Sequence, residues 1–356
     1  MTALSIGDVK TALSRIGGDP NVRQRFVDFL KELEPALAKE GVNVREELTG
    51  PLVDAMYGEG ESIRRTLASG VALTFPYRSK IARDFVMSAD PRPDHVWEPQ
   101  TTKLLLLLGE GAKNIIIGGA YFGDQAIPLA HAVAASGGVC HCFDVNREQL
   151  SYLAENAAQN RLTNVRINPL GLWDHDDRRL ELVGDDSHAC SREATHPTDV
   201  GTFLTISIGT YAARNQIGTI DLIMLDIEGA ELAALRGAQR FLEQPAAAAP
   251  RIIFEVHRSY TDWSRGLDKA DICAYLIGLG YSVFAIRDYQ SNVQMRDRPI
   301  ELVPVDDIYL EGPPHGFNML AVKDTRVLAQ KRLQLVPGVS PKLLFHRDPR
   351  LHQPRT

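Results

Sequence analysis

The sequence is poor in cysteine and has no long apolar run. Its four cysteines, at positions 140, 142, 190 and 273, are too few and too scattered for a disulfide framework, and they fit a reducing compartment. The apolar run Leu104–Leu108 is far shorter than the roughly 20 residues of a membrane helix. The N-terminus lacks the basic and then apolar stretches of a secretory signal. We therefore expect a soluble cytoplasmic protein with no membrane partner.

Positive charge is not in excess either. Lys and Arg total 39 against 45 for Asp and Glu, which gives a formal net charge of -6. Proteins that bind nucleic acid usually carry a basic face, so we expect no nucleic acid as a partner. The chain has 356 residues, 44% of them hydrophobic, and is long enough for a full α/β domain and a smaller element.

The chain divides into three parts. Over residues 1–97 no strands alternate with helices, and apolar residues recur at helical spacing from Phe26 to Leu37. A proline-rich break at residues 90–94 marks a boundary. We predict a helical N-terminal cap or interface region over residues 1–97, a main domain over 98–323, and a C-terminal extension over 324–356 that is either docked or mobile.

The main domain shows short apolar runs that alternate with helical patterns. We predict seven strands, at about residues 114–117, 139–143, 165–167, 220–225, 251–256, 281–286 and 316–322. The helices between them are predicted at about 124–135, 147–159 and 269–279. This alternation is typical of an α/β fold with a mostly parallel, Rossmann-like sheet that is covered by helices on both faces.

A glycine-rich turn follows the first of these strands, over residues 118–124. Small residues at such a turn allow a ligand to approach the backbone closely. The turn lacks both the Gly-x-Gly-x-x-Gly spacing of a dinucleotide site and the Gly-Lys-Ser/Thr end of a phosphate loop. A tight turn without a ligand stays an alternative. The cofactor-binding candidates here are Gly119, Ala120, Tyr121, Gly123 and Asp124.

Acidic residues follow the next two strands. Asp144, with Val145 after it, comes about 20 residues after the turn, where a carboxylate can accept hydrogen bonds from a ribose diol. The alternative role of Asp144 is to cap the next helix. Asp174 could accept a hydrogen bond from an adenine amino group, with Leu172 and Trp173 against the ring. These residues suggest a site for a nucleoside without a pyrophosphate group.

The segment Leu225–Glu231 carries three carboxylates at the end of a buried strand. Asp226, Glu228 and Glu231 follow the apolar run 220–225, and ligands of open α/β sheets bind at this edge. Helix capping would explain one such acid. Three acids around Gly229 favour a function, because a buried carboxylate costs folding energy unless it is paired or used.

With these motifs in hand, the chain resembles the FkbM family of class I S-adenosyl-L-methionine (SAM) dependent methyltransferases over about residues 98–323. The segments that carry the resemblance are Gly119–Asp124, Phe143–Asp144, Leu225–Glu231, Leu235–Ala238 and Ile253–His257. The resemblance implies a class I methyltransferase sheet, SAM as cofactor, Asp226 at the cofactor site, and O-methyl transfer to a hydroxyl of a sugar or natural product.

The chain departs from the family pattern at two positions. Ile117 stands where the family usually has an acid that holds the methionine amino group, and Asp144 stands where it usually has Glu. We expect Glu98, in the preceding segment, to supply a replacement acid at the cofactor.

An O-methyltransferase must also remove the acceptor's proton. His257 follows the fifth strand on the same sheet edge as Asp226, and imidazole titrates near neutral pH, so we predict it as the base. Glu255 and Asp226 could orient His257, or all three could bind Mg²⁺ or another divalent cation. A packing or surface role for His257 stays open. We expect Cys140, His141 and Cys142 to be ordinary strand residues.

Two other functions compete with methyl transfer. One is a nicotinamide-dependent oxidoreductase, against which the missing dinucleotide motif argues. The other is a non-catalytic scaffold, which Ile117 keeps open. The predicted partner is a small-molecule acceptor whose identity the sequence leaves undetermined, and a homo-oligomer stays open as well.

Overall fold

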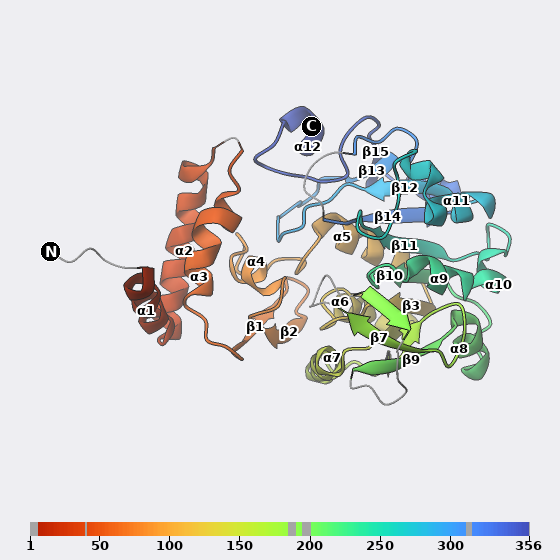
Figure 1. Cartoon of the computed structure of the whole chain (residues 1–356), viewed down its shortest axis with the longest axis horizontal. Coiled ribbons are helices and arrows are strands. Elements are labelled where there is room, and N and C mark those ends of the chain that lie inside the picture. The colour runs from red at the N-terminus through yellow and green to blue at the C-terminus, as the bar shows by residue number, and fades with distance from the viewer. Residues whose placement is uncertain (1–5, 40, 184–189, 194–200, 311–314, 356) are drawn as a thin grey trace.

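The computed structural model describes residues 6–39, 41–183, 190–193, 201–310 and 315–355. Figure 1 shows the N-terminal helices at one end of the long axis and the central sheet with its helices at the other. No helix in the described ranges is both long and apolar enough to cross a membrane.

A nine-stranded sheet forms the centre of the described structure. Its strands are β3 (Asn114–Gly118), β4 (Val139–Phe143), β5 (Val165–Asn168), β10 (Leu222–Leu225), β11 (Arg251–Val256), β12 (Ser282–Ile286), β13 (Ile300–Pro304), β14 (Phe317–Val322) and β15 (Leu333–Leu335). Their order is β15-β13-β12-β14-β11-β10-β3-β4-β5. The run from β11 to β5 is parallel, and β14 is antiparallel to both neighbours. The predicted mostly parallel sheet is confirmed, and β13 and β15 extend it beyond the seven strands expected.

Alternating side chains of the central strands face two separate cores. Ile115 and Ile117 belong to one core and Ile116 to the other, as the two-residue period of a strand requires. The first core is covered by α5 (Pro99–Gly109), α6 (Ala126–Val133) and α7 (Arg147–Gln159). The second is covered by α8 (Ile208–Arg214), α9 (Glu231–Arg236), α10 (Gln239–Leu242) and α11 (Asp271–Gly278). Helices therefore lie on both faces, as predicted.

The N-terminal region is helical, with one unexpected hairpin. Its helices are α1 (Ile6–Gly17), α2 (Pro20–Leu37), α3 (Gly50–Asp54) and α4 (Ala82–Val86), with a π-helical turn at Arg45–Thr49. Asp19 caps α2, and its side chain accepts hydrogen bonds from Asn21 N and Val22 N. The strands β1 (Ser62–Thr66) and β2 (Ala72–Pro76) form an antiparallel pair, where the sequence predicted only helical or irregular structure. Leu73 and Phe75 are fully buried while Ala72 and Thr74 are half-buried, which is the alternation of a strand.

Amide side chains of α7 hold the free edge of β2. Asn156 accepts a hydrogen bond from Thr74 N and donates to Thr74 O, at 2.8 and 3.0 Å. Asn160 makes the same pair of hydrogen bonds with Ala72, at 2.8 and 2.6 Å. We call these two side chains the amide clamp. It fixes the N-terminal hairpin to the main domain through backbone groups that would otherwise lack partners.

A second, four-stranded sheet was not predicted. It comprises β6 (Gly171–Leu172), β7 (Arg179–Val183), β8 (Cys190–Glu193) and β9 (Thr202–Ile206) in the order β6-β9-β7-β8. The side chain of Cys190 lies outside what the structure describes. The other three cysteines are buried and free, in agreement with the absence of a disulfide framework.

The C-terminal segment is docked on the sheet. Beyond β14 the chain forms a 3₁₀ turn at Thr325–Ala329, then β15 beside β13, and finally α12 (Pro349–His352). Arg287 and Glu301 form a buried ion pair, and Arg287 also donates to the carbonyls of Ser340 and Leu351, which hold this segment in place. The predicted domain limits at residues 97 and 323 stay a prediction.

Candidate active site

A cavity of about 450 Å³ opens at the carboxyl ends of β3, β4, β10 and β11. This is the edge of an open α/β sheet where ligands bind. The structure brings most of the predicted site residues to it. Those that line the cavity are Glu98, Gly119, Ala120, Tyr121, Asp124, Asp144, Val145, Leu172, Trp173, Asp226 and Glu255.

The turn after β3 approaches its neighbours very closely. Gly119 has φ of 75°, and a Cβ atom there would overlap the carbonyl oxygen of Asp226, so only glycine fits. The N–H groups of Gly119 and Ala120 donate to Phe143 O at 2.9 and 3.1 Å. Tyr121 has φ of 48° and donates from its backbone N–H to Asp144 Oδ2 at 2.9 Å. The turn is therefore locked to the ends of β4 and β10.

Asp144 is positioned by backbone hydrogen bonds and not by a helix. Its Oδ1 accepts from Asn146 N at 2.9 Å and its Oδ2 accepts from Tyr121 N. The cap of α7 is Asn146, which accepts from Glu148 N and Gln149 N, so the capping alternative for Asp144 does not hold. Burial raises the pKa of Asp144. Val145 is a further backbone donor to this carboxylate, whose two oxygens have four lone pairs in all, so Asp144 can still accept a hydrogen bond from a ligand hydroxyl.

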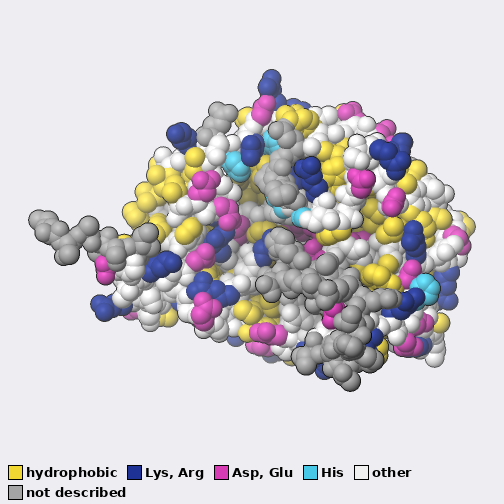
Figure 2. All heavy atoms as spheres, viewed as in Figure 1, with side chains coloured by type: hydrophobic (Ala, Val, Ile, Leu, Met, Phe, Trp, Pro, Cys, Tyr) yellow, Lys and Arg dark blue, Asp and Glu magenta, His cyan; other side chains and the backbone are white. Residues whose placement is uncertain are grey.

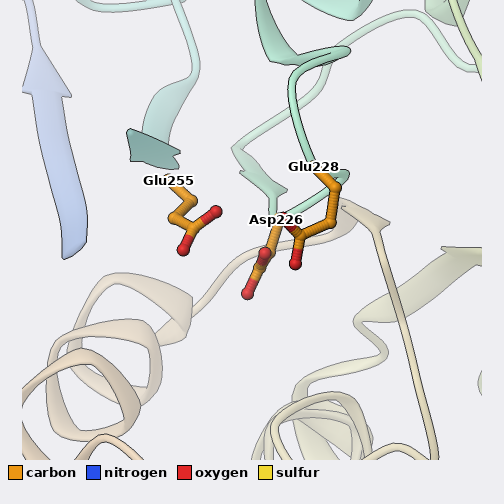
Figure 3. Close-up of side chains that lie close together, drawn as sticks. All are labelled: Asp226, Glu228 and Glu255. Atoms are coloured by element: carbon orange, nitrogen blue, oxygen red, sulfur yellow. The ribbon is translucent and has the colours of Figure 1, made fainter. Parts of the chain in front are cut away.

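Three carboxylates meet beside this turn. One ligand oxygen each of Asp226, Glu228 and Glu255 lies within 4.8 Å of the others, and Figure 3 shows Glu255 reaching from the end of β11 toward the other two. The Tyr260 hydroxyl donates to Glu255 and also lies 3.5 Å from Glu228 Oε2. Burial, and then the charge of Asp226, raises the pKa of Glu228 to about 8. Glu255, buried beside the same charge, also has a raised pKa.

The neighbouring acid Glu231 has a structural task. Its side chain accepts from the backbone N–H groups of Ile227 and Gly229, at 2.8 and 2.9 Å, and so shapes the turn before α9. Asp226 makes no cap for this helix, whose N-cap is Ala230. Of the three acids in the segment, Glu231 is therefore the structural one, while Asp226 and Glu228 face the cavity.

Glu98 enters the cavity from the N-cap position of α5. It is buried, with 6% of its surface exposed, and accepts hydrogen bonds from Gln125 Nε2 at 3.1 Å and Asn318 Nδ2 at 2.9 Å. Burial, and then the charges of Asp226 and other nearby acids, raises the pKa of Glu98 well above its usual value. The structure thus places an acid close to Asp226, although β3 itself carries Ile117 where the family usually has one.

The cavity is strongly acidic. Its six carboxylates are Glu98, Asp124, Asp144, Asp226, Glu228 and Glu255, and Lys80 is the one Lys or Arg among the lining residues. The charge of Lys80 opposes the rise in the pKa of Glu98, of Glu228 and of Glu255. Glu98 and Asp124 are buried and the other four are half-buried, and such an excess of carboxylates is costly in the absence of a positive partner. The cavity is therefore suited to a cationic ligand.

Three predicted residues do not line this cavity. His257 accepts from Ser259 N at 3.0 Å, and its ring stacks on Tyr260 with centroids 5.3 Å apart. The group of carboxylates that could hold an ion contains Glu228 where the sequence predicted His257. Asp174 pairs with His175 at 2.7 Å. Gly123, with φ of 86°, packs beneath the turn against α6 and α7.

Other lining residues were not predicted. Lys80 and Trp97 come from the N-terminal region and Gln290 from the segment after β12. They lie far from the motifs in the chain, and no local pattern marks them. Glu228 also lines the cavity, and its position in the acidic segment 225–231 could be recognised from the sequence.

Together, the sheet and the glycine turn have the Rossmann-like arrangement of class I methyltransferases. Residues 118–283 match the model of the methyltransferase FkbM domain. The predicted resemblance is confirmed. No curated protein matches the sequence.

Solved structures give weak similarity. The methyltransferase FkbM of Methylobacillus flagellatus KT is 16% identical with a TM-score of 0.37, and the match covers 59% of this chain and 44% of that one. An O-methyltransferase from Bacillus cereus in complex with S-adenosylhomocysteine (SAH) is 17% identical with a TM-score of 0.34, covering 65% and 84%. TomG of Streptomyces achromogenes, in complex with SAM, is 14% identical with a TM-score of 0.32, covering 65% and 83%. Nothing about the acceptor follows from scores this low.

Proposed function

We propose that this protein is a SAM-dependent O-methyltransferase that acts on a hydroxyl group of a sugar or natural-product small molecule. The observation that carries the proposal is the acidic cavity at the carboxyl edge of an FkbM domain. SAM carries a positive sulfonium and a positive ammonium group, and both would neutralise carboxylates that the protein buries at a cost.

The lining residues match the parts of the cofactor. Asp144 would accept hydrogen bonds from the ribose diol, and Leu172 and Trp173 would pack against the adenine ring. Glu98 would bind the ammonium group in place of the acid that Ile117 replaces. Asp226 and Glu255 would lie near the sulfonium. SAH has a neutral thioether in that position, so this interaction would be lost after transfer.

The reaction is an in-line displacement. The cofactor supplies an electrophilic methyl group. The acceptor oxygen would bond to the methyl carbon, sulfur would keep the electron pair of the broken carbon–sulfur bond, and the hydroxyl proton would leave to a base. The protein must hold the acceptor aligned and accept that proton.

We assign the proton to Glu255 or Asp226, in preference to His257. Both carboxylates line the cavity and His257 does not. Burial raises the pKa of Glu255, which favours its protonated form in the empty protein. A nearby positive charge favours its ionised form, which can then act as a base. His257, stacked on Tyr260, would position the phenol that donates to Glu255.

The test is calorimetric titration of the purified protein with SAM, SAH and NAD, beside Asp144→Ala. We expect micromolar binding of SAM and SAH, lost in Asp144→Ala and retained in the matched variant Asp174→Ala, whose carboxyl does not line the cavity. An acceptor screen with and without Mg²⁺ then tests methyl transfer. Failure of both adenosyl ligands to bind would overturn the proposal in favour of a scaffold, or of an oxidoreductase if NAD bound.

A further inference from the structure

A second, larger cavity adjoins the acidic one. Its volume is about 1270 Å³, and it shares Lys80, Trp97 and Gln290 with the first cavity. We call it the outer chamber. All its lining residues lie within 34–97 and 289–349, outside the 118–283 that match the FkbM domain. The parts of the chain beyond the family domain therefore build this space.

Two distant segments close the outer chamber on one side. The N–H of Gly41, after α2, donates to His346 O of the C-terminal segment at 2.9 Å. Apolar side chains contribute to the walls, among them Val42, Trp97 and Phe345. The ring of Phe345 stacks on Tyr289 with centroids 4.7 Å apart. The outer chamber can thus contact the apolar body of a ligand as well as polar groups.

The charge of the outer chamber is opposite to that of the first cavity. Its cationic lining residues are Lys39, Arg45, Arg78, Lys80, Arg83 and Arg347, and its acidic ones are Glu34, Glu46 and Asp54. Each of these three acids is paired with an arginine, and Arg83 pairs with two of them. Arg45 pairs with Glu34 at 2.5 Å, and Arg83 pairs with Glu46 and, at 3.1 Å, with Asp54. The acids therefore leave a surplus of positive charge.

Among the described residues, three cations of the outer chamber lack a carboxylate partner within ion-pair distance, although the charge of Lys80 also acts on the carboxylates of the first cavity. Within the part of the chain that the structure describes, Lys39, Lys80 and Arg347 form no ion pair with a carboxylate. Lys80 lies at the junction of the two cavities. Lys39 lies just after α2, and Arg347 lies in the C-terminal segment. Figure 2 shows histidine side chains and several Lys and Arg side chains gathered on the upper part of this face, where Figure 1 places α12.

We propose that the outer chamber binds the methyl acceptor, and that this acceptor carries an anionic group, a phosphate or a carboxylate, on a partly apolar body. This inference rests on the proposed function. The anionic group contacts the surplus cations, the body lies against the apolar walls, and the hydroxyl reaches the junction beside Lys80. The acidic cavity thus favours a cationic ligand, and the outer chamber favours an anionic one.

The experiment titrates the full-length protein with four ligands that share one ring system: 1-naphthyl phosphate, 1-naphthoate, neutral 1-naphthylmethanol and cationic 1-naphthylmethylamine. We expect an anion to bind about tenfold more tightly than the neutral ligand at low salt. This is roughly the gain in affinity that one charge-assisted hydrogen bond contributes. The phosphate and carboxylate ligands show which anion is preferred. Added salt should reduce the difference.

A matched pair of double variants tests where the anions bind. Lys39→Gln with Arg347→Gln should lose most of the anion preference. Arg326→Gln with Lys331→Gln removes the same charge from exposed residues that do not line the outer chamber, and should keep the preference. Equal loss in both variants, or equal binding of anionic and neutral ligands, would overturn the proposal.

Titration of the same protein with SAM separates this proposal from the proposed function. SAM binding without any anion preference would overturn the anionic acceptor alone. An anion preference without SAM binding would support the anion site and overturn the methyltransferase function.

Discussion

Glu98 has both an unfavourable backbone conformation and a buried carboxyl group. Its backbone has φ of 47°, a conformation that L-residues rarely adopt, and its carboxyl is buried close to Asp226. Residues held at such a cost cluster at functional sites, which supports its assignment to the cofactor's ammonium group.

We predict that Glu98→Gln weakens binding of SAM and SAH by about tenfold or more, the effect of one lost charge-assisted hydrogen bond. Binding of 5′-methylthioadenosine, which lacks the ammonium group, should not change. The thermal midpoint should stay about equal, because burial already favours the neutral form of the Glu98 carboxyl. Calorimetry and thermal unfolding measure these outcomes. Glu110→Gln, an exposed acid at the other end of α5, is the control. Equal weakening for all three ligands would mean that Glu98 acts through the fold.

For single residues, the sequence was most informative where the residue directly follows a strand that the sequence itself predicts. Asp144 and Asp226 directly follow buried strands, so their place at the sheet edge could be predicted. Lys80 and Trp97 could not, because they reach the cavity from a region with no recognisable motif. His257 was predicted from its position after β11, but the backbone turns there and its side chain packs on Tyr260.

The turn between β3 and α6 tolerates no side chain at Gly119, because a Cβ atom there would overlap the carbonyl oxygen of Asp226. Gly119→Ala should lower the free energy of unfolding by about 2–5 kcal/mol, since it adds a steric overlap to an unfavourable φ. Gly137→Ala shares the positive φ, 74°, but meets no atom within 4 Å, so it should cost only about 1–2 kcal/mol. Denaturant unfolding compares the two variants. Similar losses would show that the turn adjusts easily.

The strands of the central sheet were predictable because they are buried on both faces. Runs such as 114–118 and 222–225 are almost entirely apolar, and this pattern is local. The four-stranded sheet lacks such runs, since its strands include Arg179–Val183 and Cys190–Glu193, with charged residues along them. The hairpin of β1 and β2 is short, and its burial depends on α7, which lies about 80 residues away.

At the scale of the whole molecule, the carboxylates gathered in one cavity make the stability of the protein depend on pH. Burial raises the pKa of Asp124 to about 7 and that of Glu228 to about 8, so the folded protein binds more protons than the unfolded one between about pH 4 and these values. The stability that these groups contribute is full below about pH 4 and is lost as pH rises through their folded pKa values. The empty protein should unfold at a lower temperature near pH 8 than near pH 6.

A cationic ligand should reverse this trend. SAM should bind more tightly at the higher pH and release protons on binding, and SAH should release fewer because its sulfur is neutral. Calorimetry in two buffers of different ionisation enthalpy counts the protons. Proton uptake, or equal release for the two ligands, would contradict the placement of the sulfonium among the carboxylates of the acidic cavity.

The amide clamp has a consequence for self-association. A strand at the edge of a sheet can recruit a strand from another molecule through its unpaired backbone groups. β2 pairs with β1 on one side, and Asn156 and Asn160 occupy the N–H and C=O groups of Thr74 and Ala72 on the other. A two-stranded sheet that would otherwise be an aggregation hazard is thereby closed to a second copy along β2.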